Sequence, residues 1–369
     1  MHGVGLRMAK LDSDGSLYRR DFMSSVKVSV VIPCYKVEKY LPKCIASLVG
    51  QTLDSYELIF INDGSPDRCI EILKEWKKNY PEKIVIIDKK NEGVWRGRWD
   101  AIKIANGEYI GFLDSDDYAE PTFLEDLYEA ADMANADMAV CGFSRIDLES
   151  GKVLSREMCD ARTSFVVSEE PGRLLELNGA PWNKIFKASI LKSLNDLNSI
   201  PPVLDDLIFH WLSYLEMSGS VVFVPLPLVN YMVRADSIIQ TVKPQQISPT
   251  YDAFVELRQR YELHSASQSM IQALDSAAFL HLGISFNYRL AASPDCDLRL
   301  AIKNCTKLLD THFSTWRKSP YISFGYAFSH GKTYKRLLLV DYLYKLNLLP
   351  LFLAIYSGFI SFFKIDIKW

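Results

Sequence analysis

The sequence predicts an α/β fold followed by an α-helical appendage, and two patterns along the chain lead to this prediction. From residue 28 to about residue 143, short apolar runs alternate with helix-like segments, which is typical of βαβ units and a mostly parallel sheet. From about residue 245 to residue 335, helical periodicity dominates instead. The 369 residues are 49% hydrophobic and 24% charged, so a sizeable core can form and a disordered chain is excluded.

Five apolar runs in the first half are strand candidates. Their β-branched content and short length favour buried strands over helices. They are Val28–Ile32, Glu57–Ile61, Ile84–Asp88, Tyr109–Leu113 and Met138–Gly142. Helices are predicted between them, because apolar residues recur at the spacing of one helix face. These residues are Leu41, Cys44, Ile45 and Leu48, then Ile70, Leu73 and Trp76, and later Phe123, Leu127 and Ala130.

The pattern changes in the second half. Residues 144–175 are polar and irregular, and the order of elements there is left open. A short helix is expected near Arg173–Leu177, a longer helix over Leu204–Met217, and a strand over Val221–Val224 that Pro225 and Pro227 close. The helical region after residue 245 is indicated by the spacing of Tyr251, Phe254, Leu257 and Tyr261.

The two ends of the chain are also informative. Residues 1–27 contain several charges and no sustained apolar run, so we expect a disordered leader rather than a secretory signal. The seven cysteines are an odd number without zinc-site spacing, which favours reduced thiols in a cytosolic protein. Near the other end, residues 346–363 carry no charge and are flanked by Lys345, Lys364 and Lys368.

The charge is unevenly distributed. Residues 301–369 contain ten Lys or Arg against three Asp, which is +7, so the net charge of −3 leaves −10 for residues 1–300. A basic tail with an apolar, aromatic-rich run predicts a helix lying in an anionic membrane surface, at the inner face of the membrane. A buried C-terminal helix, a membrane span and a dimer contact are the alternatives. Nucleic-acid binding is excluded, because the acidic body lacks a basic face.

Polar or turn-forming residues follow four of the predicted strands. They are Pro33-Cys34-Tyr35, Asn62-Asp63-Gly64-Ser65, Asn91-Glu92-Gly93 and Asp114-Ser115-Asp116-Asp117. Each alone is typical of a turn or a helix cap. Because ligands bind at the carboxyl ends of strands in open α/β sheets, their succession predicts one site.

The last of these groups suggests a metal. Asp114 and Asp116 lie two residues apart after an apolar strand, and Mg²⁺ or Mn²⁺ prefers such oxygen ligands. A helix N-cap at Asp117 is the alternative. The sequence contains no phosphate loop, dinucleotide fingerprint, nucleophile elbow or zincin motif, which excludes those enzyme classes.

Several motifs follow one another in order along the first half of the chain. They are the run from Val28 to Leu41 with Gln51-Thr52, the run from Ile61 to Asp67, Asn91-Glu92-Gly93, Arg98 and the run from Phe112 to Asp117. In this order and spacing they closely resemble the motifs of the inverting glycosyltransferase family 2. A weaker resemblance continues to about residue 240 through Trp182–Phe186, Asp205-Asp206, Tyr231–Arg234 and Ser237-Ile238. Residues 245–369 show none.

The resemblance implies a GT-A fold that binds a nucleotide-diphospho-sugar. Pro33, Tyr35 and Glu38 would line the nucleoside pocket, and Asp63 would accept a hydrogen bond from the base. Asp114 and Asp116 would hold Mn²⁺ or Mg²⁺, and Arg98 and Arg234 would contact phosphate oxygens. The full set of implied donor-binding residues is Pro33, Tyr35, Glu38, Asp63, Gly64, Ser65, Asn91, Gly93, Arg98, Asp114, Ser115, Asp116 and Arg234.

On the acceptor side, the resemblance implies a catalytic carboxylate pair, Asp205 and Asp206, with Asp206 as the general base. The same pair could simply start a helix. Trp182 would stack on a sugar or serve as a buried anchor, and Lys184 would reach a phosphate. His210, one turn after Asp206, is expected in the core rather than on a metal.

Three residues depart from the family pattern. Lys36 and Trp99 stand where the family usually has Asn, and Trp95 is expected in a loop where smaller residues are common. These departures predict a reshaped donor pocket.

Together these observations predict a GT-A domain over residues 28–240, with a donor-binding half (28–145) and an acceptor side (146–240), and a helical region over 241–369. The expected activity is transfer from a UDP-sugar to a glycan or lipid-linked acceptor in bacterial surface polysaccharide synthesis. The alternatives are a degenerate, membrane-attached nucleotide-sugar-binding scaffold, or a metal-dependent nucleotidyltransferase. The missing Gly-rich basic loop after the first strand disfavours the nucleotidyltransferase.

Overall fold

The computed structural model describes residues 26–234, 242–291, 297–353 and 355. The expected leader therefore lies almost wholly outside the described residues, as do Ser237-Ile238 and half of the apolar run at 346–363. The strands are β1 (Val28–Cys34), β2 (Tyr56–Asp63), β3 (Ile84–Lys89), β4 (Tyr109–Phe112), β5 (Tyr118–Ala119), β6 (Met138–Asp147), β7 (Val153–Glu157), β8 (Phe165–Val166), β9 (Lys184–Lys187) and β10 (Ser220–Val233).

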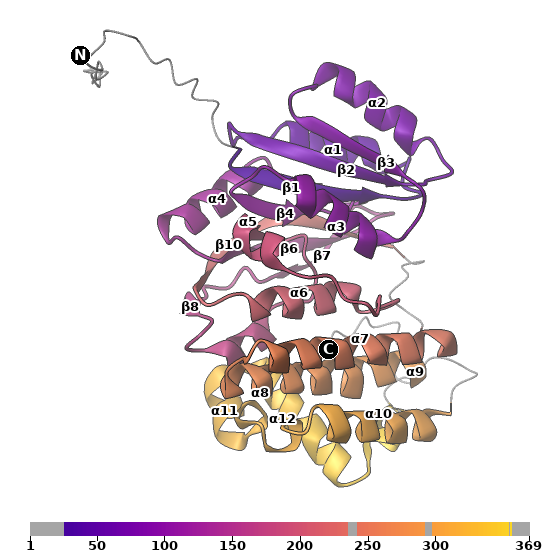
Figure 1. Cartoon of the computed structure of the whole chain (residues 1–369), viewed down its shortest axis with the longest axis vertical. Helices are drawn as coiled ribbons and strands as arrows, with labels where there is room; N and C mark the ends of the chain where they lie inside the picture. Colours follow the sequence, from indigo (N-terminus) through magenta and orange to yellow (C-terminus); the bar gives the residue numbers. More distant parts are fainter. Residues whose placement is uncertain (1–25, 235–241, 292–296, 354, 356–369) are drawn as a thin grey trace, which may run out of the picture.

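Helices alternate with the strands in the first half and follow one another in the second, so the α/β class with a helical appendage is confirmed (Figure 1). The α-helices are α1 (Leu41–Val49), α2 (Cys69–Asn79), α3 (Val94–Ile104), α4 (Phe123–Met133), α5 (Ala188–Ser193), α6 (Asp205–Leu215), α7 (Ile247–Leu263), α8 (Gln268–Ala278), α9 (Asn287–Ala291), α10 (Leu298–His312), α11 (Phe324–His330) and α12 (Lys332–Lys345). Shorter helical turns are η1 (Pro171–Glu176), η3 (Pro244–Gln246), η5 (Trp316–Lys318) and η6 (Pro320–Ile322), while η4 (Phe279–Phe286) is a π-helix.

One sheet organises the α/β half, in the order β3-β2-β1-β4-β9-β6-β10-β5. Strands β3, β2, β1 and β4 are mutually parallel, as are β6 and β10. Strand β9 runs antiparallel to both β4 and β6 and so joins the two parallel groups. Because β1, β2 and β4 run in the same direction, their carboxyl ends share one edge of the sheet, where the predicted site should lie.

The second half of the sheet is more regular than the sequence predicts. Strand β10 does not close at Pro225 and Pro227 but continues through them to Val233, with register shifts against β6 at these prolines. Proline lacks the N–H that a regular ladder needs, and a bulge accommodates it. The segment at 144–175 likewise contains the end of β6, then β7, β8 and η1.

Aromatic residues fasten α3 and α6 to the sheet. Trp95 and Trp99 on α3 contact Phe209 on α6 edge to face, with ring centroids 6.5 and 6.2 Å away, and Phe209 also packs on Phe112 of β4. Trp95 is therefore a buried helix residue and not part of a loop, which corrects the sequence-based expectation. Trp99 is buried in the same core, and the expected reshaping of the donor pocket stays a prediction.

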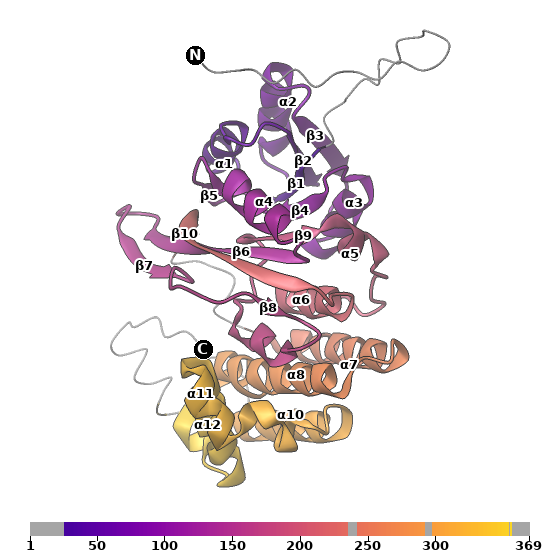
Figure 2. The same cartoon turned by 90° about the vertical axis from the view of Figure 1, so that its left-hand side faces the viewer.

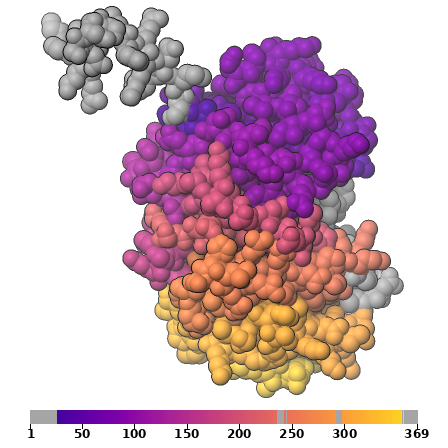
Figure 3. Space-filling view, viewed as in Figure 1, coloured from indigo at the N-terminus to yellow at the C-terminus, as the bar shows by residue number. Residues whose placement is uncertain are grey.

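The helical region packs directly on the α/β half. Figures 1 and 2 show α7, α8 and α10 stacked beyond α6 on the side away from β3, and Figure 3 shows that these layers pack without a gap on the visible face. The hydroxyl of Tyr261 on α7 donates to the carbonyl of Trp211 on α6 at 2.5 Å. Buried apolar residues of both halves form one continuous core cluster. The boundary at residue 240 stays a prediction.

The charge-free run at 346–363 is described only over its first part. Leu349 and Leu353 are buried there, while Leu346 and Leu351 are exposed. Among the described residues, the structure contains no helix with the length and apolar character needed to cross a membrane. The expected membrane-surface helix stays a prediction.

Candidate active site

The carboxyl ends of β2 and of the neighbouring strands meet at one edge of the sheet. Both carboxylate oxygens of Asp63, the last residue of β2, accept hydrogen bonds from the loop before α3, from Glu92 N at 2.9 Å and Gly93 N at 2.8 Å. Gly64 has φ +61°, and a Cβ on it would lie 2.7 Å from the backbone N of Asn91. Only glycine suits such a close approach in this conformation. The expected base-binding residue thus also holds two strand-end loops together.

The loop after β1 is tied to the loop after β2. The Ser65 hydroxyl donates to Asp67 at 2.6 Å and accepts from the backbone N of Lys36 at 2.7 Å, while Glu38 N donates to Asp67 at 3.0 Å. Lys36 has φ +57°, a left-handed conformation that asparagine adopts more readily than lysine. Tyr35 beside it is 44% exposed. Tyr35 and Glu38 therefore lie on a loop that hydrogen bonds hold against the loop after β2. Asp67 accepts two of these hydrogen bonds, although the sequence indicates it only as part of a motif.

An acidic turn follows β4. One oxygen each of Asp114, Asp116 and Asp117 lies within 4.8 Å of the others, which is the hard-oxygen donor set that Mn²⁺ or Mg²⁺ requires. Ser115 between them donates to the carbonyl of Pro33 at 2.6 Å and so joins the turn to β1.

The three carboxylates of this turn have different partners. Asp116 forms an ion pair with Arg234 at 2.6 Å, whereas Asp117 accepts from the backbone N of Met232 at 2.8 Å. The expectation that Asp117 caps a helix is wrong, because β5 follows it and α4 begins only at Phe123. Asp117 thus connects the turn to β10, and the expected role of Asp114 and Asp116 as metal ligands stays a prediction.

A second acidic pair faces this turn at the start of α6. Asp205 and Asp206 occupy the first turn of the helix, and Leu204 before them has φ +61°. A non-glycine residue in this conformation stores strain of the kind that clusters at functional sites. The predicted helix start is therefore confirmed, and the catalytic role of the pair stays a prediction.

Arg98 of α3 lies between the two acidic groups. Its Nη1 lies 3.2 Å from Asp205 and its Nη2 lies 2.5 Å from Asp206, and its side chain is only 4% exposed. Because both Nη atoms contact carboxylates, Arg98 is positioned to hold the carboxylate pair in place. The expected contact of Arg98 with a donor phosphate stays a prediction.

The site carries an excess of negative charge. Burial, followed by the charges of Asp206 and Asp116, raises the pKa of Asp114 to about 7. Burial, followed by Asp206, raises the pKa of Asp205 to about 6. Five aspartates face two arginines, a formal net charge of −3. They are Asp114, Asp116, Asp117, Asp205 and Asp206 against Arg98 and Arg234. A bound divalent cation would offset this repulsion.

The predicted acceptor-side residues are buried. Trp182 stacks on Tyr231 with ring centroids 5.4 Å apart and is 5% exposed, which favours its interpretation as an anchor over a sugar platform. Lys184 is fully buried, and its Nζ lies within 3.0 Å of four protein oxygens. Burial lowers its pKa to about 7, while the oxygens favour the ammonium form. In this structure the Lys184 ammonium is surrounded by protein oxygens, and its expected contact with a phosphate stays a prediction.

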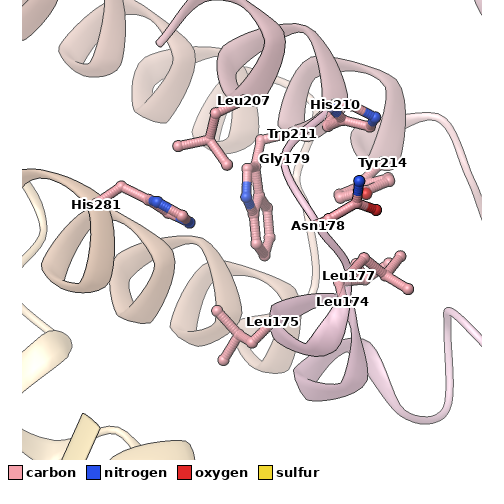
Figure 4. Close-up of a pocket in the computed structure, with 10 residues that line it drawn as sticks. All are labelled: Leu174, Leu175, Leu177, Asn178, Gly179, Leu207, His210, Trp211, Tyr214 and His281. Carbon is pink, nitrogen blue, oxygen red and sulfur yellow. The ribbon is translucent and has the colours of Figure 1, made fainter. Parts of the chain in front are cut away.

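His210 lies behind the site, in the core as predicted. Its Nδ1–H donates to the backbone carbonyl of Asp206 at 2.6 Å. Next to it, between α6, η1 and η4, is a cavity of about 10 Å³, roughly the smallest that holds a water. Figure 4 shows Trp211 at its centre with His281 on one side and Asn178 on the other. Its lining comes from the junction between the two halves, so it is separate from the strand-end site.

Comparisons with known proteins agree with this geometry. Residues 29–193 match the family model described as "Glycosyl transferase family 2". The chain is 28% identical over 240 residues to "Glycosyltransferase GlyA" of Streptococcus pneumoniae, covering 62% of this chain and 34% of that protein. It is 36% identical over 171 residues to "Poly(ribitol-phosphate) beta-glucosyltransferase" of Bacillus spizizenii, covering 45% and 26%. The chain thus spans less than two thirds of the length of these relatives.

A solved structure extends the likeness to the helical region. The crystal structure of S. aureus TarS residues 1–349 in complex with UDP-GlcNAc aligns with a TM-score of 0.66 at 18% identity, covering 87% of this chain and 92% of that one. At this identity the likeness concerns the fold alone. It includes the α/β half and most of the C-terminal helices.

Proposed function

Because residues 29–193 form a domain of glycosyltransferase family 2, we propose that this chain is an inverting transferase that uses a UDP-sugar. One observation carries the proposal. The acidic turn after β4 and the carboxylate pair at the start of α6 face each other across Arg98, at the edge where β1, β2 and β4 end. A donor diphosphate on one side and an acceptor hydroxyl on the other would then meet between two groups of carboxylates.

The donor side would use the loops after β1, β2 and β3. Pro33, Tyr35 and Glu38 line the nucleoside pocket in this proposal, and Asp63 accepts from the base with oxygens that retain lone pairs beyond their two backbone contacts. The remaining donor contacts would come from the strand-end turns and the residues beside them: Gly64, Ser65, Asn91, Gly93, Ser115 and Arg234.

Asp116 and Asp114 would hold the divalent cation, Mn²⁺ or Mg²⁺, and their oxygen donors fit such an ion. The bound cation would supply charge neutralisation for the diphosphate. Arg234, which pairs with Asp116, adds a positive charge beside the same position.

The transfer itself needs a base. In the proposed step, a carboxylate oxygen of Asp206 takes the proton of the acceptor hydroxyl. At the same time the hydroxyl oxygen of the acceptor bonds to the anomeric carbon. The bond from the anomeric carbon to the diphosphate breaks on the opposite face, and UDP leaves with the electron pair. Arg98 and the start of α6 hold Asp206 in orientation, and Asp205 completes the pair.

We further propose that the acceptor is a glycan or a lipid-linked glycan in bacterial surface polysaccharide synthesis, and that the enzyme works in the cytoplasm at the inner face of the membrane. The relative named for poly(ribitol-phosphate) glucosylation supports a polymeric acceptor. In this proposal the catalytic unit spans residues 28–240 and residues 241–369 form the helical region.

The test is UDP release by the full-length chain with a panel of UDP-sugars, with Mn²⁺ or with EDTA. Metal-dependent release with one sugar is expected, together with thermal stabilisation by the same sugar, because a ligand that binds only the folded state raises the melting temperature. If the chain binds a donor but releases no UDP, even when acceptor extracts are added, this result would instead favour the non-catalytic scaffold.

A further inference from the structure

Exposed apolar side chains gather at the end of the helical region. Eight of the large hydrophobic residues that are at least 43% exposed lie between residues 324 and 355. They are Phe324, Phe328, Leu339, Tyr342, Leu346, Leu348, Leu351 and Ile355. Soluble proteins rarely expose so many apolar side chains within a short segment unless the surface contacts a partner or a membrane.

The packing of α12 fixes which way these residues face. Tyr334, Leu337, Val340 and Tyr344 are buried on one side of the helix, and the hydroxyl of Tyr334 donates to the carbonyl of Gly172 in η1 at 2.9 Å. The inner face of α12 is thus attached to the α/β half. The opposite face must then point outward.

The residues of that outward face are regularly spaced along the helix. Lys332, Lys335, Leu339, Tyr342 and Leu346 follow one another at spacings of three or four residues, so they form one stripe along α12 and its end. All five are exposed. Two phenylalanines of α11 extend the stripe, since Phe324 and Phe328 stack with centroids 4.3 Å apart and the Lys335 ammonium lies 4.9 Å from the Phe328 ring. We call these seven residues the α11–α12 face.

This segment carries a net positive charge. Residues 324–355 contain four Lys or Arg and one Asp, a net +3, within a chain whose first 300 residues sum to −10. Lysines that flank exposed aromatic and leucine side chains suit the boundary between lipid headgroups and acyl chains. A second copy of this chain would bring the same positive charge to the contact, which disfavours a symmetric dimer.

We propose that the α11–α12 face docks on an anionic phospholipid bilayer. Phe324, Phe328, Leu339 and Tyr342 enter the interface, and Lys332 and Lys335 contact acidic headgroups. The face lies on the helical layers, at the end of the molecule farthest from α2 (Figures 1 and 2), so docking leaves the strand-end site free for its substrates. The docking proposal takes its biological setting from the proposed function, in which the enzyme works at a membrane. The experiment that tests it measures vesicle binding alone.

The test is co-sedimentation of the full-length chain with vesicles of equal parts phosphatidylglycerol and phosphatidylcholine, against phosphatidylcholine alone. Binding to the acidic vesicles only, weakened by salt, is expected. Because one lysine near such a surface contributes about a fivefold change in binding, Lys332→Gln with Lys335→Gln should weaken binding about 25-fold. Lys332→Arg with Lys335→Arg should retain it.

The apolar part of the face has a matched control. Phe324→Ser with Phe328→Ser should weaken binding roughly tenfold or more, because two aromatic rings lose their burial. Met133→Ser with Leu263→Ser removes side chains that are 81% and 78% exposed elsewhere and should change nothing. UDP release with a water-soluble acceptor should be the same in all variants, so a failure of docking is distinguishable from a failure of catalysis.

Two results would overturn the proposal. One is that the Lys332/Lys335 and Phe324/Phe328 variants bind vesicles as strongly as the unmodified chain does. The other is that the unmodified chain self-associates in a concentration-dependent way, measured by sedimentation velocity, and that the Phe324/Phe328 substitutions abolish this association but leave vesicle binding unchanged. The second result would assign the face to another copy of the chain.

Discussion

Arg98 bridges the carboxylates of Asp205 and Asp206, although it lies more than one hundred residues before them in the sequence. Its guanidinium is nearly inaccessible to solvent and also lies 6.0 Å from the Phe209 ring. The pair at the start of α6 therefore depends on α3 for both its charge balance and its orientation.

Replacing Arg98 should damage both stability and turnover. Arg98→Ala leaves two carboxylates without their partner. Breaking a fully buried ion pair from one side costs about 3–5 kcal/mol, and the loss here should be smaller because the two aspartate side chains are 24% and 36% exposed. Arg98→Lys retains the charge but lacks the planar fork that reaches both aspartates, so its loss should be smaller. Urea unfolding and UDP release measure the two effects. An Arg98→Ala variant with unchanged stability would contradict the bridging role.

Asp206 should be needed for the chemical step rather than for donor binding. Asp206→Asn retains the shape of the side chain but removes the base, so turnover should fall about 10²- to 10⁴-fold. UDP affinity, measured by calorimetry with Mn²⁺, should change little. Asp205→Asn is the comparison, and we expect a weaker effect from it. Normal turnover by the Asp206 variant would remove the proposed base.

The three aspartates after β4 should separate into metal-binding and structural residues. Asp116→Ala should weaken Mn²⁺-dependent UDP binding, and EDTA should abolish the binding of the unmodified chain. Asp117→Ala should instead lower the melting temperature, because Asp117 accepts from the backbone N of Met232 in β10 and alanine leaves that buried N–H without its partner. Calorimetry and thermal unfolding test this contrast. Equal loss of metal-dependent binding in both variants would place Asp117 among the ligands.

Much of this site follows from local sequence patterns. The apolar runs before Asp63 and Asp114 predict buried strands, and both aspartates lie where those strands end. The contacts between distant segments do not follow from such patterns. Nothing local pairs Arg98 with Asp206, and nothing local buries Lys184 among four oxygens.

The same limit applies to the fold. Pro225 and Pro227 are strand-ending residues by their local chemistry, yet β10 continues past them because its long pairing with β6 tolerates bulges. Trp95 lies two residues after Gly93 in a polar stretch and so resembles a loop residue. Its burial depends on Phe209, which lies on a helix far along the chain.

Acidification should loosen the junction between the two halves. Burial, followed by the charge of Arg289, lowers the pKa of His281 to about 3, while an unfolded histidine titrates near 6.5. Between these values the unfolded chain binds the proton and the folded chain does not, so stability falls as pH falls from about 6.5 toward 3.

Substituting His281 should reduce this pH dependence. The slope from one such group is at most about 1.4 kcal/mol per pH unit. His281→Gln should therefore flatten the fall in unfolding free energy between neutral pH and pH near 5, while the stability at neutral pH changes less. Urea unfolding over this pH range measures the slopes. Parallel curves for the variant and the unmodified chain would exclude His281 as a source of the acid sensitivity.

Gly64 should be essential for the contact between the loops after β2 and β3. Gly64→Ala would place a Cβ 2.7 Å from the backbone of Asn91 at a φ of +61°, so it adds a clash to a conformational penalty of about 1–2 kcal/mol. Gly151→Ala is the matched control, because Gly151 has φ +69° but nothing within 4 Å of the added atom. Both variants should lose some stability, but only Gly64→Ala should weaken UDP binding, since its clash displaces the loop that Asp63 holds. Equal UDP affinity in the two variants, measured by calorimetry, would show that this loop contact does not shape the donor site.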